Sequence, residues 1–461
     1  MFELTREEQK RIHSQVLRIL HEVGVEIGHP KILEALDGIG ARIDKAAMRA
    51  RFDADLVEAF LAACPKTDRQ DRRPELAVRA SLYSGKYHDP ETGKLVPFEP
   101  RHLTDYFRLA KVLPHVTGYF VTGCQWRVPP ETEPLWERFH AWKYGLQNSN
   151  TLYPLESADS ILALCETYAA LKNLPVRNVA GGGVFMMSPL RLSAEEADQF
   201  VWWWQRGFRV GISHMSTAGL SAPVTLPGLV ALHLAEAVAI GLVDKACYGG
   251  NAFPGGAMIA PADMRTMIRP YGRPEMAVAN GLWASMTRFY GVDCWVQSGL
   301  TEAKLPSVEA GAQKTMTTLS ALAEGADTLL DAGTLSIDQV FSPIQMILDH
   351  ELAGALQRML ERPRVTEETV AADVVREVEP GGLFTGTMHT AKHFRDEIWE
   401  PRVWGRQMLQ AWEEAGGPLD VDRAAALYRE WMADAPDPSV LTPDEEETLL
   451  KVIRRAEAGD K

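Results

Sequence analysis

The sequence lacks several motifs that carry chemistry in other proteins. Its five cysteines are odd in number and form no Cys-x-x-Cys pair, which argues against a disulfide framework and a zinc ribbon. No Gly-x-Gly-x-x-Gly, Walker A or His-Glu-x-x-His sequence occurs, so neither a nucleotide-binding loop nor that zinc-protease site is indicated. The Gly-x-Ser-x-Gly nucleophile motif is also absent. The absence of a nucleophile motif fits a reaction in which the protein itself forms no covalent bond.

The sequence also lacks a net positive charge and long apolar runs. The formal net charge is −14, whereas a nucleic-acid-binding protein normally presents a basic face. The first residues, MFELTREEQKRIH, contain no apolar signal core. No run approaches the roughly 20 apolar residues of a membrane span. With 46% hydrophobic residues the chain can still bury a large core. We therefore expect a cytoplasmic protein with reduced thiols and no nucleic-acid or membrane partner.

The remaining sequence alternates strand and helix patterns. Residues 1–100 predict a helical N-terminal extension with a β-hairpin, and residues 418–461 predict a helical segment that wraps the outside. Residues 101–417 contain eight strand candidates separated by helical stretches, which predicts an α/β fold of the TIM (β/α)8 barrel type. The eight candidates are residues 118–123, 150–155, 177–187, 209–214, 245–251, 293–298, 328–332 and 382–387.

The candidate site residues follow from this barrel, because functional side chains lie at the carboxyl ends of its strands. Those ends are rich in aromatic and amide residues and poor in charge, which suits a small organic cation held by cation–π contacts. The same aromatic residues can instead serve ordinary packing. The substrate-binding candidates are Gln125, Tyr153, Glu156, His214, Tyr248, Asn251, Phe253, Trp295, Gln297 and Lys304, and the catalytic candidates are Glu302, Asp331 and His389.

Some of these residues have a second interpretation. Glu302 and Lys304 could form an ion pair that only holds their loop. His389 and His393 are spaced i, i+4, as zinc ligands on one helix are, but no third ligand is evident nearby, so we expect no metal site. His389 then contacts substrate and His393 makes a structural hydrogen bond. Glu236, flanked by alanines in a helix, is either partly buried and paired or faces solvent.

Six segments resemble one known family. They include the run Ala222-Pro223-Val224-Thr225-Leu226-Pro227-Gly228 and the C-terminal run from His389 to Arg402. In their amino-acid sequences and in their order along the chain, the segments resemble the trimethylamine methyltransferase family of corrinoid-dependent methyltransferases. Because all residues are standard, the resemblance is to the branch without pyrrolysine, which acts on betaine-like quaternary amines. The six segments are residues 19–30, 89–93, 219–228, 298–311, 349–352 and 389–402.

The resemblance implies both a reaction and a partner. It implies a TIM barrel that moves a methyl group from a methylated amine to the cobalt of a corrinoid (cobalamin), which a separate small protein carries. Such carriers show Asp-x-His-x-x-Gly, which this sequence lacks, so the chain is expected to need a corrinoid protein as partner and to bind no corrinoid tightly itself. We also expect a homo-oligomer.

The expected substrate is a small quaternary amine. Its trimethylammonium head is expected against Tyr153, Tyr248, Phe253 or Trp295, with Glu156 or Asp331 nearby, and a substrate carboxylate would be held by His214, His389 or Lys304. The sequence departs from relatives at Leu330-Asp331 and at Thr301-Glu302-Ala303-Lys304, around the presumed pocket. Three alternatives therefore stay open: demethylation of a sulfonium such as dimethylsulfoniopropionate, direct methyl transfer to a pterin, and a non-catalytic onium-binding protein on the same scaffold.

Overall fold

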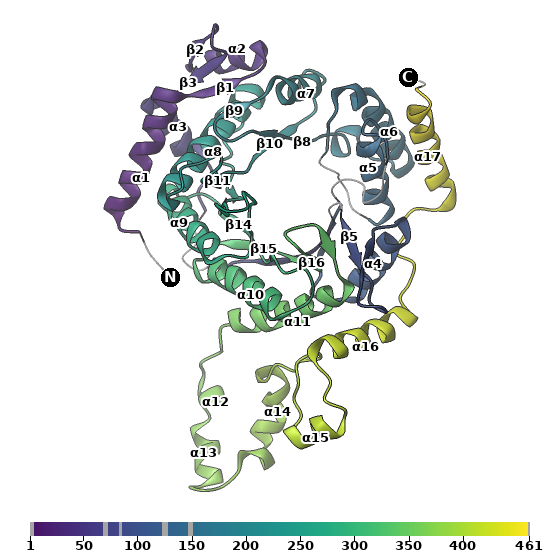
Figure 1. The fold of residues 1–461 in the computed structure, drawn as a ribbon. Helices are drawn as coiled ribbons and strands as arrows, with labels where there is room; N and C mark the ends of the chain where they lie inside the picture. Colours follow the sequence, from purple (N-terminus) through teal and green to yellow (C-terminus); the bar gives the residue numbers. More distant parts are fainter. Residues whose placement is uncertain (1–3, 68–71, 83–84, 122–127, 146–150, 460–461) are drawn as a thin grey trace.

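Parallel strands form the centre of the computed structural model, which describes residues 4–67, 72–82, 85–121, 128–145 and 151–459. Five strands are hydrogen-bonded in the order β12-β14-β15-β4-β7, and β10 pairs with β8. Thr151 extends the second sheet through a parallel bridge to Gly183. Figure 1 shows these strands arranged around a ring, which we call the ring below. Their bounds are Leu76–Leu82 (β4), Gly118–Val121 (β7), Gly182–Met186 (β8), Val210–His214 (β10), Gly256–Ala257 (β12), Trp295–Ser298 (β14) and Asp327–Ala332 (β15).

A helix follows each of these strands and lies outside the ring (Figure 1). The alternation of strand and helix is that of an α/β protein, as the sequence predicts. Hydrogen bonding is not continuous around the whole ring among the described residues, since no ladder joins β7 to Thr151 or β10 to β12. The outer helices are Pro100–Val112 (α4), Glu133–Lys143 (α5), Ala158–Lys172 (α6), Ala194–Trp204 (α7), Leu226–Tyr248 (α8), Pro274–Tyr290 (α9), Val308–Ala323 (α10) and Pro343–Leu360 (α11).

The predicted first barrel strand corresponds to β7, which is the second of the ring strands along the chain. β4, which the sequence analysis assigned to the N-terminal extension, lies between β15 and β7 and pairs in parallel with both. The alternation Leu76-Ala77-Val78-Arg79-Ala80 is a strand pattern, but it stands in a polar, turn-rich region. The parallel sheet therefore begins before residue 100.

Two other predicted strands are wrong. Residues 245–251 end α8 and begin a loop, because the apolar run of that helix continues to Tyr248 and stops at Gly249, whose φ of 73° closes the helix. The strand of this unit is β12, a few residues later. Residues 382–387 contain the short 3-10 helix Phe384–Gly386 (η4) and lie outside the ring, so they cannot close it.

Short strands extend the chain beyond the carboxyl ends of the ring strands. β11 and β13 pair in parallel, and a four-stranded sheet has the order β16-β17-β5-β6. These additions place loops and side chains over one end of the ring. Their bounds are Lys86–His88 (β5), Leu95–Pro97 (β6), Thr217–Ala218 (β11), Ala260–Pro261 (β13), Thr334–Leu335 (β16) and Val340–Phe341 (β17).

The N-terminal residues form a helical layer against α8 and α9. The first helix begins with the capping box of Thr5 and Glu8 that the sequence predicts. A small sheet, β2-β3-β1-β9, joins this layer to the segment after β8. The elements are Arg6–Arg18 (α1), Ile19–Val23 (η1), Val25–Ile27 (β1), Pro30–Gly38 (α2), Arg42–Asp44 (β2), Arg49–Arg51 (β3), Ala54–Ala63 (α3) and Arg191–Leu192 (β9), with the 3-10 turns Leu155–Ser157 (η2) and Val176–Asn178 (η3) further on.

α8 is the one helix among the described residues that is long and apolar enough to cross a membrane. The sequence analysis expected no such run. Most of the helix is buried, in contact with α1, α2 and α9, so it is accounted for as a core helix.

The C-terminal residues leave the ring and return to it. Residues 361–418, called the lobe below, project away from the ring in Figure 1. The chain then packs α16 against α11 and α4, and α17 against α6 and α5. The bounds are Glu367–Val370 (α12), Ala372–Val378 (α13), Met388–Glu397 (α14), Leu409–Glu414 (α15), Asp420–Ala433 (α16) and Pro443–Glu457 (α17).

Candidate active site

The ring strands have one face toward the outer helices and one face toward the inside of the ring. In β4, Val78 and Ala80 are buried against the helices, so Arg79 between them points inward, and it is exposed. In β8, Val184 and Met186 are buried in the same manner, and Phe185 is 51% exposed on the inner face. The inner face therefore carries both a cation and an aromatic ring.

Arg79 lies beside Asp331 on this inner face. The two residues are register partners across β4 and β15, and Arg79 is paired on its other side with Gly118. A Cβ at Gly118 would lie 3.1 Å from Arg79 Cγ, so the glycine leaves space for the arginine side chain. Arg79 makes no hydrogen bond or ion pair with any residue that the structure describes. Among the described residues, no partner therefore occupies its guanidinium.

Asp331 is almost fully buried at the carboxyl end of β15. Its carbonyl oxygen accepts a hydrogen bond of 2.8 Å from Lys314 Nζ, which also forms a buried ion pair of 2.7 Å with Asp349. Asp349 in turn accepts a 2.8 Å bond from the Gly333 N–H. Burial raises the pKa of Asp349, and the Lys314 ammonium opposes that change. This network holds the end of β15, and with it Asp331, in place.

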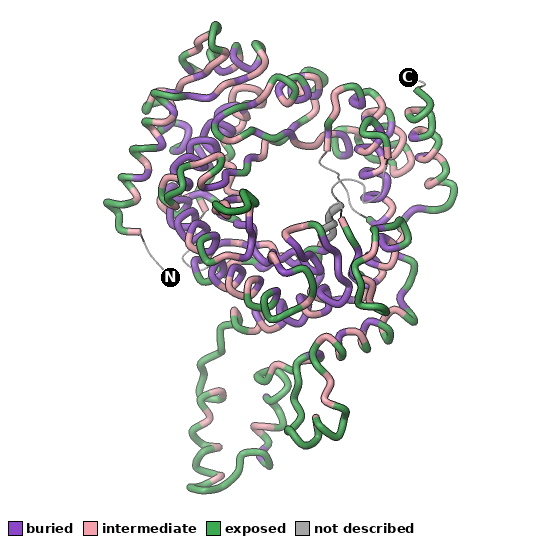
Figure 2. Tube along the Cα trace, viewed as in Figure 1, coloured by how far each residue is buried: buried purple, intermediate pink, exposed green. Residues whose placement is uncertain are grey.

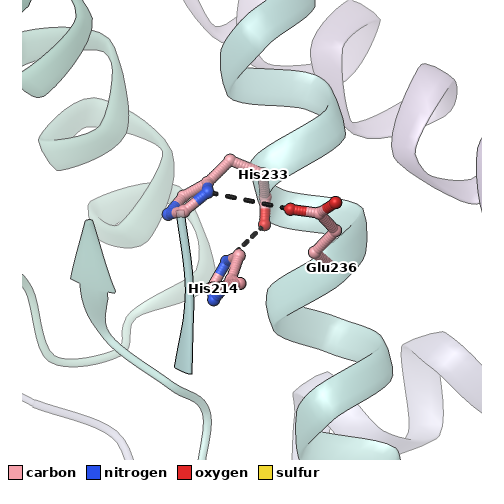
Figure 3. A group of neighbouring side chains, drawn as sticks. All are labelled: His214, His233 and Glu236. Carbon is pink, nitrogen blue, oxygen red and sulfur yellow. Dashed lines mark hydrogen bonds and ion pairs between the residues drawn. The ribbon is translucent and has the colours of Figure 1, made fainter. Parts of the chain in front are cut away.

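A second buried cluster lies behind the ring, between β10 and α8 (Figure 3). Glu236 Oε1 accepts a 2.9 Å hydrogen bond from the Leu190 N–H, and Oε2 accepts 2.8 Å bonds from the hydroxyls of Ser188 and Ser216. His233 Nδ1 lies 2.8 Å from Ser216 Oγ and can donate to it. Glu236 is therefore buried and paired, the first of the two alternatives, and it joins the loops after β8 and β10.

The two histidines of this cluster are uncharged at neutral pH and have a structural role. The rings of His214 and His233 stack with centroids 3.8 Å apart, and His214 Nε2 donates to the His233 carbonyl at 3.1 Å. Burial lowers the pKa of His214 to about 4 and also lowers that of His233. One ligand atom from each of His214, His233 and Glu236 lies within 4.8 Å of the others, which is a metal-like grouping. Both Glu236 oxygens are already hydrogen-bonded, however, so we interpret the cluster as a support.

Exposed apolar side chains surround the carboxyl ends of β8 and β10. Tyr153, Met187 and Met215 are all at least 40% exposed there, next to Phe185. Tyr271 donates a hydrogen bond to Met215 Sδ at 3.8 Å, and the Arg269 guanidinium lies 5.2 Å from the centroid of its ring. Burial raises the pKa of Tyr271, so its hydroxyl stays protonated at neutral pH. This end of the ring has the aromatic and thioether surface that a weakly hydrated cation prefers.

The other candidates near this end have mixed positions. Tyr153 and Glu156 are exposed after Thr151, and Gln297 is buried on the inner face of β14. Glu302 forms two 3.1 Å contacts with Arg273, so its carboxylate is already occupied. Lys304 Nζ donates to the Glu302 carbonyl at 2.6 Å rather than to its carboxylate. Lys304 also lines a rim cavity of about 520 Å³.

Four candidates lie at the opposite, amino-terminal ends of the strands. Tyr248 Oη accepts a 3.1 Å bond from the Val210 N–H at the start of β10, and Asn251 accepts a 3.0 Å bond from Lys245. Phe253 lines a separate cavity of about 180 Å³. Trp295 is the first residue of β14. The predicted placement at the carboxyl ends is therefore wrong for these residues, mainly because α8 is longer than predicted.

His214 and His389 are also misplaced by the sequence analysis. His214 points away from the inside of the ring, toward α8, and its Nε2 is hydrogen-bonded. His389 lies on α14 in the lobe, where its Nε2 is 3.2 Å from the Glu368 carbonyl oxygen. Gln125 lies outside the described residues. The predicted convergence of eight side chains on one cavity is wrong for His214, Asn251 and His389.

Sequence analysis missed Arg79 and Tyr271. The strand pattern from Leu76 to Ala80 could have revealed Arg79, since a single arginine between buried apolar positions must face the other side of the strand. Tyr271 lies in a loop after β13, and no spacing in the sequence connects it to the strand ends.

Sequence comparisons identify the family of this chain. A family model described as trimethylamine methyltransferase (MTTB) matches residues 1–84 and 151–459. A glycine betaine methyltransferase of Desulfitobacterium hafniense (strain Y51) is 24% identical over 99% of this chain and 98% of its own. A trimethylamine methyltransferase MttB of the same species (strain DSM 10664 / DCB-2) is 23% identical over 91% and 86%. The crystal structure of the Methanosarcina barkeri monomethylamine methyltransferase aligns with 93% of this chain and 87% of its own, at 10% identity and a TM-score of 0.45.

Proposed function

Because this chain belongs to the trimethylamine methyltransferase family, we propose that it removes a methyl group from a small zwitterionic quaternary amine of the betaine type. The methyl acceptor in this proposal is the cobalt of a corrinoid on a separate carrier protein. Relatives named for trimethylamine and for glycine betaine support the reaction class but leave the substrate open at 23–24% identity.

We also propose that the ring is a (β/α)8 barrel. Eight strand–helix units follow one another from β4 to α11 if Thr151 belongs to the third strand, and the last strand, β15, is paired in parallel with the first. In such a barrel the active site lies at the carboxyl ends of the strands. Two of the candidates, Asp331 and the exposed Phe185, lie near the carboxyl ends of their strands. The exposed Met187 and Met215 are the residues that directly follow the ends of β8 and β10.

One observation carries the choice of a zwitterionic substrate. The guanidinium of Arg79, which has no partner among the residues that the structure describes, belongs to the register partner of Asp331 on the inner face. A guanidinium binds a carboxylate with two parallel N–H donors. An onium group is attracted by a carboxylate and by aromatic faces, each good cation–π contact contributing about 0.5–2 kcal/mol. Arg79 therefore takes the role of carboxylate anchor that the sequence analysis gave to His214, His389 or Lys304.

The chemistry needs little acid or base catalysis. When the C–N bond of a quaternary ammonium breaks, nitrogen keeps the electron pair and leaves as a neutral tertiary amine, so no proton has to be supplied. A reduced corrinoid on the carrier would, when bound, supply the electron pair for the new bond to the methyl carbon. The protein has to hold the onium carbon in line with the acceptor and keep water away. Arg79, Asp331 and the aromatic side chains do this by orienting the substrate.

The partner and the compartment follow from the same proposal. The sequence contains no Asp-x-His-x-x-Gly motif, so in this proposal the carrier protein holds the corrinoid and approaches the carboxyl end of the ring. The described cysteines Cys64, Cys165, Cys247 and Cys294 are free thiols, which suits a reducing cytoplasm.

The test compares ligands with and without a carboxylate by calorimetry. Wild-type protein is expected to bind glycine betaine, carnitine or proline betaine more tightly than choline. Arg79→Gln should weaken binding of the carboxylated ligand by about 10–100-fold, the loss of a charged hydrogen-bonded pair, and change choline binding by less than about twofold. Lys304→Gln is the matched control and should change neither ligand. Equal losses for both ligands in Arg79→Gln would remove the anchor role.

Measurements of methyl-transfer turnover distinguish the proposed reaction from the alternative substrates, the alternative acceptor and simple binding. The proposal requires that glycine betaine or a related amine loses a methyl group only when a corrinoid carrier or free reduced cobalamin is present. Turnover with a pterin alone, or faster turnover of dimethylsulfoniopropionate than of any betaine, would favour the other enzymatic readings. Tight binding without any methyl transfer to a competent carrier would identify an onium-binding protein.

A further inference from the structure

The loop between β16 and β17 has an unusual backbone conformation. Ser336 and Ile337 both have positive φ angles, of 53° and 72°. Residues other than glycine rarely adopt this left-handed region, and for a β-branched residue such as isoleucine it is a marked outlier. Strain of this kind persists only where the surrounding structure enforces it, and it is concentrated at functional sites. A simple connection between two strands does not require it.

Backbone hydrogen bonds and apolar packing hold this loop in place. The N–H groups of Ser336 and Ile337 each donate, at 2.7 Å, to a carbonyl oxygen in the loop after β14. The Ile337 side chain packs against Tyr271 and its apolar neighbours. Figure 2 shows the chain through β15 and β16 as mostly buried, and the two residues that follow Ser336, Ile337 and Asp338, are partly buried. Asp338 is thereby fixed close to the Tyr271 cluster.

Asp338 carries a negative charge that no cation balances. It forms no ion pair with any residue in the described ranges, and its carboxylate accepts a hydrogen bond only from its own N–H. Burial raises the pKa of Asp338, and no positive charge of the described chain opposes this change. Carboxylates that proteins remove from water are normally paired with a cation or a donor. The carboxylate of Asp338 therefore lacks the counter-charge that its position calls for.

The comparable carboxyl groups of this chain all have partners. Among the described residues, burial also raises the pKa of Glu196, Glu236 and Asp349. Each of these three accepts a hydrogen bond of 2.7–3.2 Å from another residue. Asp338 differs from them because its only donor is its own backbone.

Tyr271 connects Asp338 with the candidate active site. The Tyr271 hydroxyl donates to Met215 Sδ, at the carboxyl end of β10. Burial raises the pKa of Tyr271, and the negative charges of Asp338 and Asp331 raise it further, so both carboxylates lie within electrostatic range of the same phenol. Asp331 is in turn the register partner of Arg79. One ligand of modest size can therefore reach both Arg79 and Asp338.

We propose that Asp338 binds the positively charged head of the substrate, beside Tyr271 and Met215. This inference rests on the proposed function and extends it, because it names the group that recognises the onium charge. A quaternary nitrogen has no N–H to donate, so its attraction to a carboxylate depends on distance and local dielectric rather than on hydrogen-bond direction. The bound onium supplies the counter-charge that Asp338 lacks, while Arg79 holds the substrate carboxylate at the other end.

The experiment compares glycine betaine with 3,3-dimethylbutyrate, in which carbon replaces the quaternary nitrogen. The two ligands share their shape and their carboxylate, so the ratio of their dissociation constants measures recognition of the positive charge alone. By calorimetry, wild-type protein is expected to bind glycine betaine at least about tenfold more tightly, the effect of one charge pair in a partly buried site. Asp338→Asn should lower this preference to less than about threefold, and should change binding of 3,3-dimethylbutyrate by less than about twofold.

Two control variants and a stability measurement accompany this comparison. Asp338→Glu keeps the charge and should keep most of the preference for glycine betaine. Asp55→Asn makes the same chemical change at an exposed position on α3, outside the ring, and should leave the preference unchanged. Because an unpaired, partly buried carboxylate destabilises the fold at neutral pH, Asp338→Asn should melt at or above the wild-type temperature.

The outcomes separate this inference from the proposed function. If wild-type protein prefers glycine betaine and Asp338→Asn keeps the full preference, Asp338 does not bind the onium head, and the proposed function stands. Equal wild-type binding of the two ligands would also overturn the inference, because no group would then recognise the charge. A melting temperature of Asp338→Asn several degrees below that of wild type would identify a structural residue instead. If neither ligand binds to wild-type protein, both proposals are wrong.

Discussion

Glu236 offers the sharpest test of how the candidate active site is supported. Its two carboxylate oxygens accept three hydrogen bonds, from the Leu190 N–H and from the hydroxyls of Ser188 and Ser216. Glu236→Ala removes both acceptor oxygens, and with them three hydrogen bonds, from a fully buried position. The two hydroxyls can turn to other partners, but the amide N–H cannot. One orphaned donor costs about 1–3 kcal/mol, and with the weakened hydroxyl bonds we expect a loss of about 3–4 kcal/mol in the free energy of unfolding.

The Glu236→Gln variant keeps the shape of the side chain and changes only its charge and hydrogen bonding. The amide oxygen can still accept from the Leu190 N–H, and the amide nitrogen faces hydroxyls that can rotate to accept. We expect a cost of about 1 kcal/mol for this exchange. The loops joined by Glu236 carry Met187 and Met215, so their displacement should reduce kcat/KM by about 10–100-fold in the alanine variant and by less than about threefold in the glutamine variant.

Urea unfolding and methyl-transfer kinetics with glycine betaine measure both effects. Glu166→Ala, at an exposed glutamate on α6, is the control and should change stability by less than about 0.5 kcal/mol. If the free energy of unfolding of Glu236→Ala lies within about 0.5 kcal/mol of the wild-type value, the three hydrogen bonds do not stabilise the loops. If the alanine and glutamine variants lose activity equally, the charge of Glu236 matters rather than the geometry it holds.

Two further predictions concern stability. His214 has a pKa of about 4 in the folded protein against 6.5 in the unfolded chain, so as pH falls below 6.5 the unfolded chain takes up a proton first and stability is lost. Between pH 7.5 and pH 5 wild type should lose about 2 kcal/mol more than His214→Gln, and equal pH profiles in urea unfolding would contradict this. Lys314→Met leaves the buried Asp349 carboxylate without its ion-pair partner and should lower the free energy of unfolding by about 3–5 kcal/mol. The double variant Lys314→Met/Asp349→Asn should recover part of this loss. If thermal melts show no recovery, the two residues are not coupled.

The amino-acid sequence by itself determined the local elements. Apolar runs bounded by turn residues placed strands within the predicted ranges 177–187, 209–214 and 293–298, and Thr5 with Glu8 determined where the first helix begins. These features depend on neighbours within a few residues, so periodicity and capping are enough to predict them. The family could also be predicted, because six motifs occur in order along the chain.

Tertiary structure decided which elements meet and which face each side chain presents. β4 became a ring strand only because β15 and β7 pair with it, and that pairing placed Arg79 beside Asp331 across a sequence distance of about 250 residues. An apolar run such as that ending α8 is equally suited to a helix or a strand, and its length was settled by packing against α1, α2 and α9. Residues 382–387 have a strand-like sequence but no neighbouring strand among the described residues, and a strand without a hydrogen-bonding neighbour does not form.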